Sequence, residues 1–316
     1  MSSLAASAAS AALVVLMAGP VPTEIALPAQ PAPLHGTLLA PEGEVAAVAV
    51  ILPGSGPTDR DGNSPLGIRA ATYRLLAEGL AEDGIATVRM DKRGIGASAA
   101  AGGSEADLRF GDYVADARAW TSEAVRRTGK PCAWLIGHSE GALIATLAAE
   151  NNPEVCGLVL LSGAGRPAIT VLREQFQAVP EPVRGQALTI LDRLEKGETV
   201  ADVPPALAAA FRPSVQPYLA SWAPLDPAEA LGRYRGPFFI GQGETDLQTR
   251  ETDAQALKAA RPDATLVIWP GVNHVLKTAP ADRQANMAVY VAPDLPLAPG
   301  VAEDVAGFIR EHTPSH

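Results

Sequence analysis

Residues 133–141 read A-W-L-I-G-H-S-E-G, a short apolar run that meets a Gly-His-Ser-Glu-Gly turn. Glycines two residues before and two residues after a serine let a strand and the following helix pass close together, and the serine then sits at a sharp turn. Residues 132–136 have the pattern of a buried strand, and residues 142–149 have that of a tightly packed helix. Strand, turn and helix are the setting in which such a serine serves as a nucleophile, so we predict this role for Ser139.

Strand-like and helix-like segments alternate along most of the chain. The pattern predicts strands at residues 34–39, 45–52, 85–90, 132–136, 157–161, 238–241 and 265–269. The segment 45–52 is a continuous apolar run, which is typical of a strand in a sheet buried on both faces. Apolar residues at three-and-four spacing indicate helices at residues 73–80, 110–127, 142–149, 251–260 and 301–312. The alternation predicts an α/β fold with a doubly wound, mostly parallel sheet, in which functional side chains gather at the carboxyl ends of the strands.

Residues 166–232 interrupt this alternation. The segment holds two weakly amphipathic helical patterns, at 171–177 and 185–194, together with many prolines and no strand-like run. We interpret it as a helical cap inserted into the sheet domain. The core of the fold is then built from residues 31–165 and 233–316.

The first residues of the chain are a separate segment. Residues 10–18 form an apolar run with the length of a signal-peptide h-region, too short to span a bilayer, and a polar, Pro-rich stretch follows at 19–33. No Lys or Arg precedes the run, although export signals normally have one. We expect residues 1–30 to lie outside the fold, either as the signal peptide of an exported (periplasmic or secreted) protein or as a disordered segment of a cytoplasmic one. A wrongly assigned start codon is a further alternative.

The chain has two cysteines, Cys132 and Cys156, and each lies beside an apolar strand-like run. If the two strands are neighbours in a parallel sheet, the sulfur atoms can approach closely enough to bond. A disulfide would require an oxidising compartment and hence export. The alternative is a pair of buried thiols that pack as small apolar side chains.

The composition excludes some classes of partner. The 316 residues include 25 basic and 35 acidic side chains, with a net charge of −10 and no block of Lys or Arg. Binding to nucleic acid or to an anionic membrane surface depends on clustered cations, so we expect neither. No apolar run is long enough for stable membrane insertion, and the sequence leaves the oligomeric state open.

A serine hydroxyl needs a base within hydrogen-bond reach and an acid that orients the base. Among five histidines, His274 follows a predicted strand in the loop P-G-V-N-H, which makes it the candidate base. His138 adjoins the serine, but alternate strand residues face opposite sides, so we expect it to be a buried bystander. Asp246 in G-Q-G-E-T-D also follows a strand and lies between serine and histidine in the sequence, so it is the candidate acid. Glu244 is the alternative.

Acyl transfer also requires donors for the negative charge that develops on the carbonyl oxygen, ideally backbone N–H groups. One is the amide of Glu140, the residue after the candidate nucleophile. The second is expected from the loop P-G-S-G at residues 53–56, where we favour the amide of Ser55. The alternative is that this loop is an ordinary tight turn.

Five motifs in this order resemble those of the serine α/β-hydrolase superfamily, and within it bacterial esterases with a helical cap between strands six and seven. The motifs are L-P-G-S-G-P-T-D-R-D-G-N at 52–63, D-K-R-G-I-G-A-S at 91–98, G-H-S-E-G at 137–141, G-E-T-D at 243–246 and N-H-V-L-K at 273–277. The resemblance covers residues 34–312. One departure is Pro53-Gly54, where many relatives have His-Gly. Because the oxyanion donor is a main-chain amide, we expect this change to affect the support of the loop more than the chemistry.

The resemblance implies hydrolysis of small-molecule carboxylic esters with small to medium acyl chains, without a cofactor or metal. Ser139 would form the acyl-enzyme, His274 would transfer the proton, and Asp246 would orient the histidine. Two alternatives stay open: a peptidase or amidase of the same fold, and a degenerate hydrolase fold used only for binding. Four aromatic residues of the predicted cap either line an acyl pocket or simply pack: Phe176, Phe211, Tyr218 and Trp222.

Two further polar segments resemble functional sites. Residues 59–63, D-R-D-G-N, have the start of a calcium-binding loop, but Ser64 and Ala70 stand where that loop requires Gly and Glu. We therefore expect Asx turns there and no metal. In residues 91–98 we expect a structural role, with Arg93 paired to a nearby carboxylate.

Overall fold

The computed structural model describes residues 20–314, so the apolar run at 10–18 and its predicted role as a signal peptide lie outside the described residues. Eight strands form the main sheet. In spatial order they are β1 (Pro22–Leu27), β2 (Leu34–Leu39), β6 (Ile85–Met90), β3 (Ala47–Leu52), β7 (Ala133–His138), β8 (Val155–Leu161), β9 (Phe238–Gly243) and β10 (Thr265–Trp269). β2 runs antiparallel to both of its neighbours, β1 and β6, and the other neighbouring pairs run parallel. The predicted mostly parallel sheet is confirmed.

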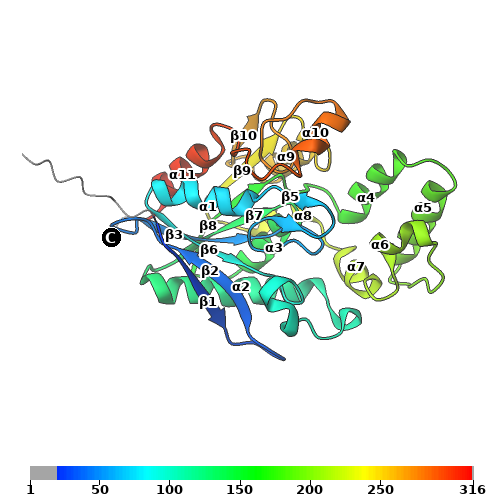
Figure 1. Ribbon diagram of the computed structural model, residues 1–316, viewed down its shortest axis with the longest axis horizontal. Helices are drawn as coiled ribbons and strands as arrows, with labels where there is room; N and C mark the ends of the chain where they lie inside the picture. The colour runs from blue at the N-terminus through cyan, green and yellow to red at the C-terminus, as the bar shows by residue number, and fades with distance from the viewer. Residues whose placement is uncertain (1–19, 315–316) are drawn as a thin grey trace, which may run out of the picture.

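Helices cover both faces of this sheet (Figure 1). One face carries α1 (Thr72–Glu82) and α11 (Val301–His312), which pack against each other. The opposite face carries α2 (Phe110–Thr128), α3 (Glu140–Ala149), α8 (Pro227–Arg233) and α9 (Glu251–Ala260). The buried strand β3 shows why two layers of helices are needed, because its alternate side chains lie in different apolar clusters. Val50 faces the cluster that contains α2, whereas Ile51 faces the cluster that contains α1 and α11.

Short elements lie in the loops of the core. They are the two-stranded pair β4 (Asn63–Ser64) and β5 (Ile68–Arg69), the 3-10 helices η1 (Gly96–Ala101) and η2 (Glu105–Asp107), and the helix α10 (Arg283–Val289). The sequence patterns did not indicate any of these five, because each is shorter than the windows over which a helical or strand period can be recognised.

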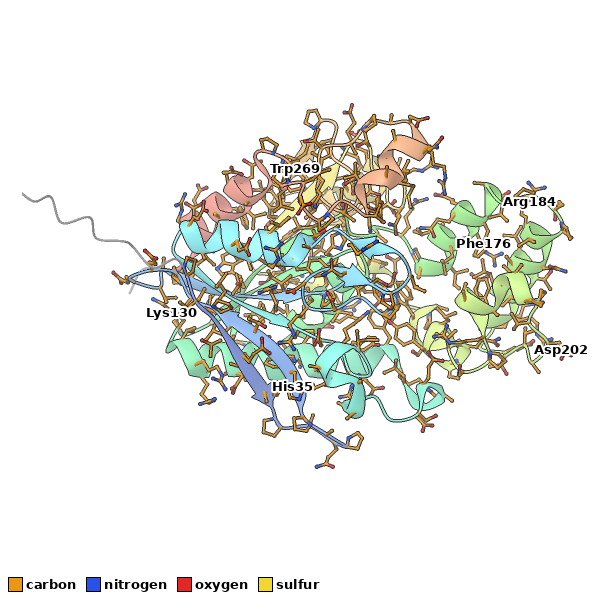
Figure 2. All side chains as sticks on the ribbon, in the orientation of Figure 1. His35, Lys130, Phe176, Arg184, Asp202 and Trp269 are labelled. Carbon is orange, nitrogen blue, oxygen red and sulfur yellow. A yellow bond between two sulfur atoms is a disulfide. The ribbon has the colours of Figure 1, made fainter. Side chains whose placement is uncertain are left out.

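A lobe of short helices lies beside the core (Figure 1). This helical lobe consists of α4 (Ala168–Gln177), α5 (Val183–Glu195), η3 (Pro205–Leu207), α6 (Ala208–Phe211) and α7 (Gln216–Trp222). This lobe has an apolar cluster of its own. Figure 2 labels two residues of the lobe, Phe176 and Arg184. The segment that we interpret as a cap, residues 166–232, extends a little further, because it includes most of α8. That helix packs on α3 and α9 of the core.

The amino-terminal boundary of the fold lies earlier than we predicted. Residues 1–30 were expected to lie outside it, but β1 (Pro22–Leu27) pairs with β2 along its whole length, and Ile25 is buried. The alternating polar pattern of P-T-E-I-A-L is that of an edge strand with one face on the core, which a search for continuous apolar runs misses. Within residues 20–314, no helix is long and apolar enough to cross a membrane.

Cys132 and Cys156 form a disulfide, with their Cα atoms 5.2 Å apart. Both lie at the amino-terminal ends of neighbouring parallel strands, β7 and β8. The structure thus resolves the alternative that the sequence left open in favour of a bridge. The bridge lies at the edge of the sheet opposite to the one where the carboxyl ends of these strands meet.

Candidate active site

Ser139 occupies a strained turn between β7 and α3. Its backbone has φ 54° and ψ −119°, in a region that non-glycine residues rarely adopt, and its N–H is held by the carbonyl oxygen of Leu161 at 2.9 Å. The flanking glycines explain how the turn can close. A Cβ at Gly137 would lie 2.2 Å from the carbonyl oxygen of Gly141, and one at Gly141 would lie 2.3 Å from that of Leu52. Any larger residue at either position would force the strand and the helix apart.

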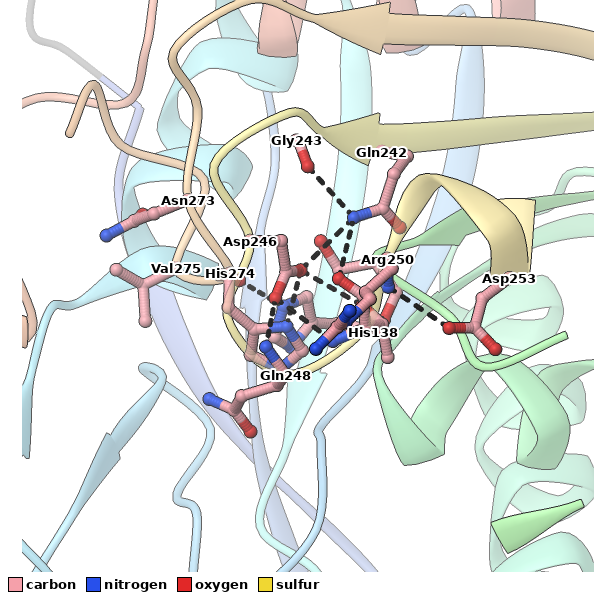
Figure 3. A network of polar contacts seen from close by, with 12 residues as sticks. His138, Gln242, Gly243, Asp246, Gln248, Arg250, Asp253, Asn273, His274 and Val275 are labelled. Atoms are coloured by element: carbon pink, nitrogen blue, oxygen red, sulfur yellow. Dashed lines mark hydrogen bonds and ion pairs between the residues drawn. The ribbon is translucent and has the colours of Figure 1, made fainter. Parts of the chain in front are cut away.

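An Asp–His pair lies at the carboxyl ends of the two neighbouring strands. Asp246 follows β9 and His274 follows β10, and the pairing of these strands brings the two loops together. Nδ1 of His274 donates to Oδ2 of Asp246 at 2.7 Å, and both side chains are buried (Figure 3). Glu244, the alternative acid, is exposed and accepts from the amide of Gly271 instead. Asp246 is therefore the acid in contact with the histidine.

The surroundings of Asp246 favour its ionised form. Its oxygens accept hydrogen bonds from the amides of Gln248 and Thr249, from the Thr249 hydroxyl and from the Gln242 amide group. Burial acts to raise the pKa of the Asp246 carboxyl, but the charge and hydrogen bond of His274, together with the backbone donors, outweigh it, so this pKa lies below its ordinary value. An ionised carboxylate fixes the Nδ1–H tautomer of His274 and leaves Nε2 free to accept a proton.

His138 is buried, as expected, but it is not a bystander. Its Nε2 lies 2.7 Å from the carbonyl oxygen of His274, and its Nδ1 lies 2.9 Å from the hydroxyl of Tyr73. Since a carbonyl can only accept, Nε2 carries the proton and Nδ1 accepts from Tyr73. The tyrosine oxygen in turn accepts from the amide of Gly54 at 2.9 Å. A continuous chain of hydrogen bonds thus joins the loop after β3 to the loop of His274.

The loop after β3 lies directly against the candidate nucleophile. A Cβ added to Gly54 would lie 3.2 Å from the Cβ of Ser139. Ser55 and Glu140, whose amides the sequence proposes as oxyanion donors, line the same hollow as Ser139. Within residues 20–314 the Ser55 amide has no hydrogen-bond acceptor, and the Glu140 amide belongs to the first turn of α3, where N–H groups lack intrahelical partners. Both amides are available to a ligand.

Two hollows meet at Ser139. The first, of about 110 Å³, lies between the core and the helical lobe, and it is lined mainly by apolar side chains such as Leu143, Val171 and Trp222. The second, of about 210 Å³, is lined by Ser139 and His274 together with residues of the β4–β5 region. The structure therefore places the candidate serine and the candidate base on the wall of one hollow, with the first hollow adjoining it at Ser139.

The four aromatic residues of the predicted cap divide between lining and packing. Trp222 lines the first hollow. Phe176 and Phe211 pack on each other inside the lobe, with ring centroids 5.4 Å apart. Tyr218 packs on Phe110 of α2 and so connects the lobe to the core.

The two polar segments that resemble functional sites have structural roles. Oδ1 of Asp59 accepts from the amides of Asp61 and Asn63, which are the expected Asx-type turns. No cluster of metal-ligating side chains occurs in the described part of the chain. Arg93 pairs with Asp116 on α2 through two hydrogen bonds of 2.7 and 2.6 Å, as expected.

Sequence reasoning missed two buried polar side chains of this site, Tyr73 and Lys92. It also missed that His138 links two loops through its hydrogen bonds. Lys92 was quoted only as part of a motif, yet it is 2% exposed and contacts the loop after β3. The available signal was a lysine two residues after a predicted buried strand, because an ionised side chain is rarely buried without a partner.

Three features are typical of the α/β-hydrolase fold: the mostly parallel sheet, the strained serine after β7, and the Asp–His pair after β9 and β10. A family model described as serine aminopeptidase, S33, matches residues 66–206, which is less than half of the chain. The structure therefore has the fold of the α/β-hydrolases, and the family match supports a serine hydrolase of that fold. A comparison with curated protein sequences finds no match.

Similar solved structures span nearly the whole chain. Est1E from Butyrivibrio proteoclasticus, solved with ferulic acid bound, has a TM-score of 0.60 and 19% identity over 91% of this chain and 98% of that one. The esterase domain of a Rhodothermus marinus protein has a TM-score of 0.57 and 17% identity over 93% and 100%. The proline iminopeptidase of Mycobacterium smegmatis has a TM-score of 0.56 and 16% identity over 92% and 99%. At these identities the likeness establishes the fold, and the similar proteins include both esterases and a peptidase.

Proposed function

We propose that this protein is a carboxylesterase that hydrolyses small esters through an acyl-enzyme at Ser139. The observation that carries the proposal is the buried pair of His274 and Asp246, joined by a 2.7 Å hydrogen bond and opening onto the cavity that Ser139 lines. In the proposed reaction, His274 takes the serine proton as the hydroxyl oxygen attacks the ester carbonyl. It then returns the proton to the departing alcohol, and water repeats the sequence on the acyl-enzyme.

The amides of Ser55 and Glu140 are proposed to stabilise the negative charge on the carbonyl oxygen. Backbone donors that are fixed before the reaction begins stabilise the transition state without reorganisation, and the loss of one such donor typically lowers kcat about 10²- to 10³-fold. The proposal is supported by the free state of both amides and by their place on the wall of the first hollow. No cofactor enters the proposed chemistry.

The linings of the two hollows favour an ester over an amino-terminal peptide substrate. An aminopeptidase must bind the α-ammonium group of its substrate, which calls for a carboxylate at the site. Among the described residues that line the two hollows, Glu140 is the one acid, and its carboxylate pairs with Lys92. The cation of Arg166 is likewise neutralised, by Asp253 and Glu174. The first hollow is thus suited to an uncharged, apolar acyl chain of small to medium length.

The experiment uses purified protein and its Ser139→Ala variant with p-nitrophenyl acetate, p-nitrophenyl butyrate and an aminoacyl p-nitroanilide. We expect ester turnover that Ser139→Ala abolishes, and little turnover of the anilide. Ester turnover that survives in Ser139→Ala would exclude Ser139 as the nucleophile. Faster turnover of the anilide than of the esters would favour the peptidase alternative. Failure of the native protein to react with a fluorophosphonate, which requires an activated serine, would favour a hydrolase fold used only for binding.

We also propose that the protein is exported to an oxidising compartment. The disulfide between Cys132 and Cys156 supports this, since such bonds are rare in the cytosol of most organisms. The apolar run at residues 10–18 is compatible with a signal peptide.

A further inference from the structure

A buried ion pair lies beneath the candidate oxyanion site. Lys92 follows β6 and Glu140 begins α3, and Nζ of Lys92 lies 3.4 Å from Oε1 of Glu140. Both side chains are 2% exposed. The ammonium also lies 5.0 Å from the centre of the Tyr113 ring, which adds a favourable cation–π contact. Both charged side chains are thus almost completely buried.

Stability alone is a poor explanation for this pair. Burial lowers the pKa of Lys92, and the nearby Glu140 carboxylate only opposes that effect. Taking two charges out of water is costly, and apolar replacements of buried ion pairs are often neutral or stabilising. The third contact of the ammonium is therefore the informative one.

That contact is the carbonyl oxygen of Gly54, to which Nζ of Lys92 donates at 2.7 Å. The amide of the same residue donates to Tyr73, so both polar groups of Gly54 are held by buried side chains. In a trans peptide the C=O and the following N–H point in opposite directions. The hydrogen bond from Lys92 to the Gly54 carbonyl therefore orients the N–H of Ser55 away from Lys92. The Ser55 amide has no hydrogen-bond acceptor within residues 20–314.

We propose that Lys92 is a positioning residue of the oxyanion site, which holds the Gly54–Ser55 peptide so that the Ser55 amide faces the substrate oxygen. This inference rests on the proposed esterase function. Its counter-ion, Glu140, supplies the second proposed donor from its own main chain. One buried ion pair therefore links the two segments that carry the donors, the loop after β3 and the first turn of α3, and fixes the distance between them.

The inference predicts a specific kinetic signature. Lys92 does not touch the substrate, so its loss should leave KM within about twofold. Misplacement of a donor by an ångström weakens transition-state binding, and we expect kcat to fall about 10- to 100-fold, less than for complete removal of a donor. The affinity for a trifluoromethyl ketone, whose tetrahedral adduct carries the same oxyanion, should fall by the same factor as kcat/KM.

The test compares Lys92→Met with Arg93→Met. The control removes a neighbouring ion pair in the same loop, but the partner of Arg93 is Asp116, and Arg93 has no contact with Gly54 or Glu140 in the described residues. Thermal unfolding of both variants measures the structural cost. Because Lys92→Met leaves the Glu140 carboxylate buried without its partner, the double variant Lys92→Met/Glu140→Gln is made as well. It removes both charges while the main-chain amide of residue 140 is kept.

Support requires that Lys92→Met and the double variant both lose kcat and trifluoromethyl ketone affinity in parallel, while Arg93→Met keeps native kinetics. Two results would overturn the inference: kcat in the double variant within twofold of Arg93→Met, or loss of kcat with unchanged affinity for the ketone. Ester turnover in Ser139→Ala would instead overturn the proposed function, so the two failures are distinguishable.

Discussion

The Nε2–H of His138 donates to the carbonyl oxygen of His274 at 2.7 Å, so the residue before the candidate nucleophile holds the loop of the candidate base. The two imidazole rings lie 4.8 Å apart, centre to centre. Because His138 is the last residue of β7, this contact couples the position of the turn at Ser139 to that of the loop after β10. The relative placement of Ser139 and His274 then depends on a side chain that does not itself react.

Replacing His138 with Leu should lower kcat about 10-fold or more. The change leaves the buried carbonyl of His274 without a donor and frees its loop to shift, and small shifts of a catalytic group are costly. His138→Gln keeps an N–H donor and should retain more activity. Steady-state kinetics of the two variants, with thermal unfolding as the control, measure the difference. Equal loss in both would show that the hydrogen bond does not position the base.

The same histidine should make stability depend on pH. Burial, followed by the charge of His274, lowers the pKa of His138 from 6.5 to about 3. Between these two pH values the unfolded chain binds a proton at His138 that the native state does not bind. The free energy of unfolding is therefore at its full value above pH 6.5 and decreases as the pH falls below it. The slope is about 1.4 kcal/mol per pH unit. Urea unfolding between pH 7 and pH 4.5 should show this extra slope relative to His138→Gln, and parallel curves would contradict it.

Asp246→Asn should reduce kcat on the order of 10³- to 10⁴-fold with little change in KM, because an amide in place of the carboxylate no longer stabilises the Nδ1–H tautomer or the imidazolium that forms. Glu244→Gln is the matched control, since it removes the alternative acid from the same loop. It should stay within twofold of the native protein. The assignment of the acid would be wrong if the two variants showed the reverse order of activity.

The first hollow should limit the length of the acyl chain. Trp222→Ala enlarges a space of about 110 Å³, so kcat/KM for octanoate esters should rise relative to that for butyrate. Each further methylene that becomes buried contributes about 0.8 kcal/mol, or roughly fourfold. Phe176→Ala removes another aromatic ring of the lobe, one that packs on Phe211 and does not line the hollow. It should leave the chain-length profile unchanged, and an equal shift in both variants would count against the hollow as the acyl pocket.

The disulfide should contribute to stability but not to catalysis. The sequence separation of Cys132 and Cys156 is 24, for which loop-closure entropy gives a stabilisation of about 3 kcal/mol. Cys132→Ser/Cys156→Ser should therefore lower Tm and leave kcat unchanged, because the bridge lies at the end of the strands away from Ser139. A change in kcat at temperatures well below Tm would contradict this.

In a bacterial host, the full chain should appear in the periplasm with the bond formed, and purely cytoplasmic activity would argue against export.

Much of the fold was predictable because it depends on local periodicity. The helix at Glu251–Ala260 and the strands at Ile85–Met90 and Thr265–Trp269 have the bounds that the sequence indicated, since the apolar pattern acts over a few residues. The strand at Pro22–Leu27 was missed for a physical reason. An edge strand with one solvated face needs few apolar residues. It is held by backbone hydrogen bonds to its partner β2, and its own side-chain pattern does not predict that pairing.

The residue types that carry the proposed chemistry can be read from the amino-acid order: a serine in a glycine-flanked turn, an acid and a histidine, each after its own strand. Which polar groups support them depends on the folded arrangement. In the sheet, β6 lies beside β3, and β3 lies beside β7, an order that differs from the order in the chain. This arrangement brings Lys92, Gly54 and Glu140 into contact from segments that are far apart in the sequence. No local pattern encodes such a contact, because it depends on how strands pair, and strand pairing is set by the packing of the whole core.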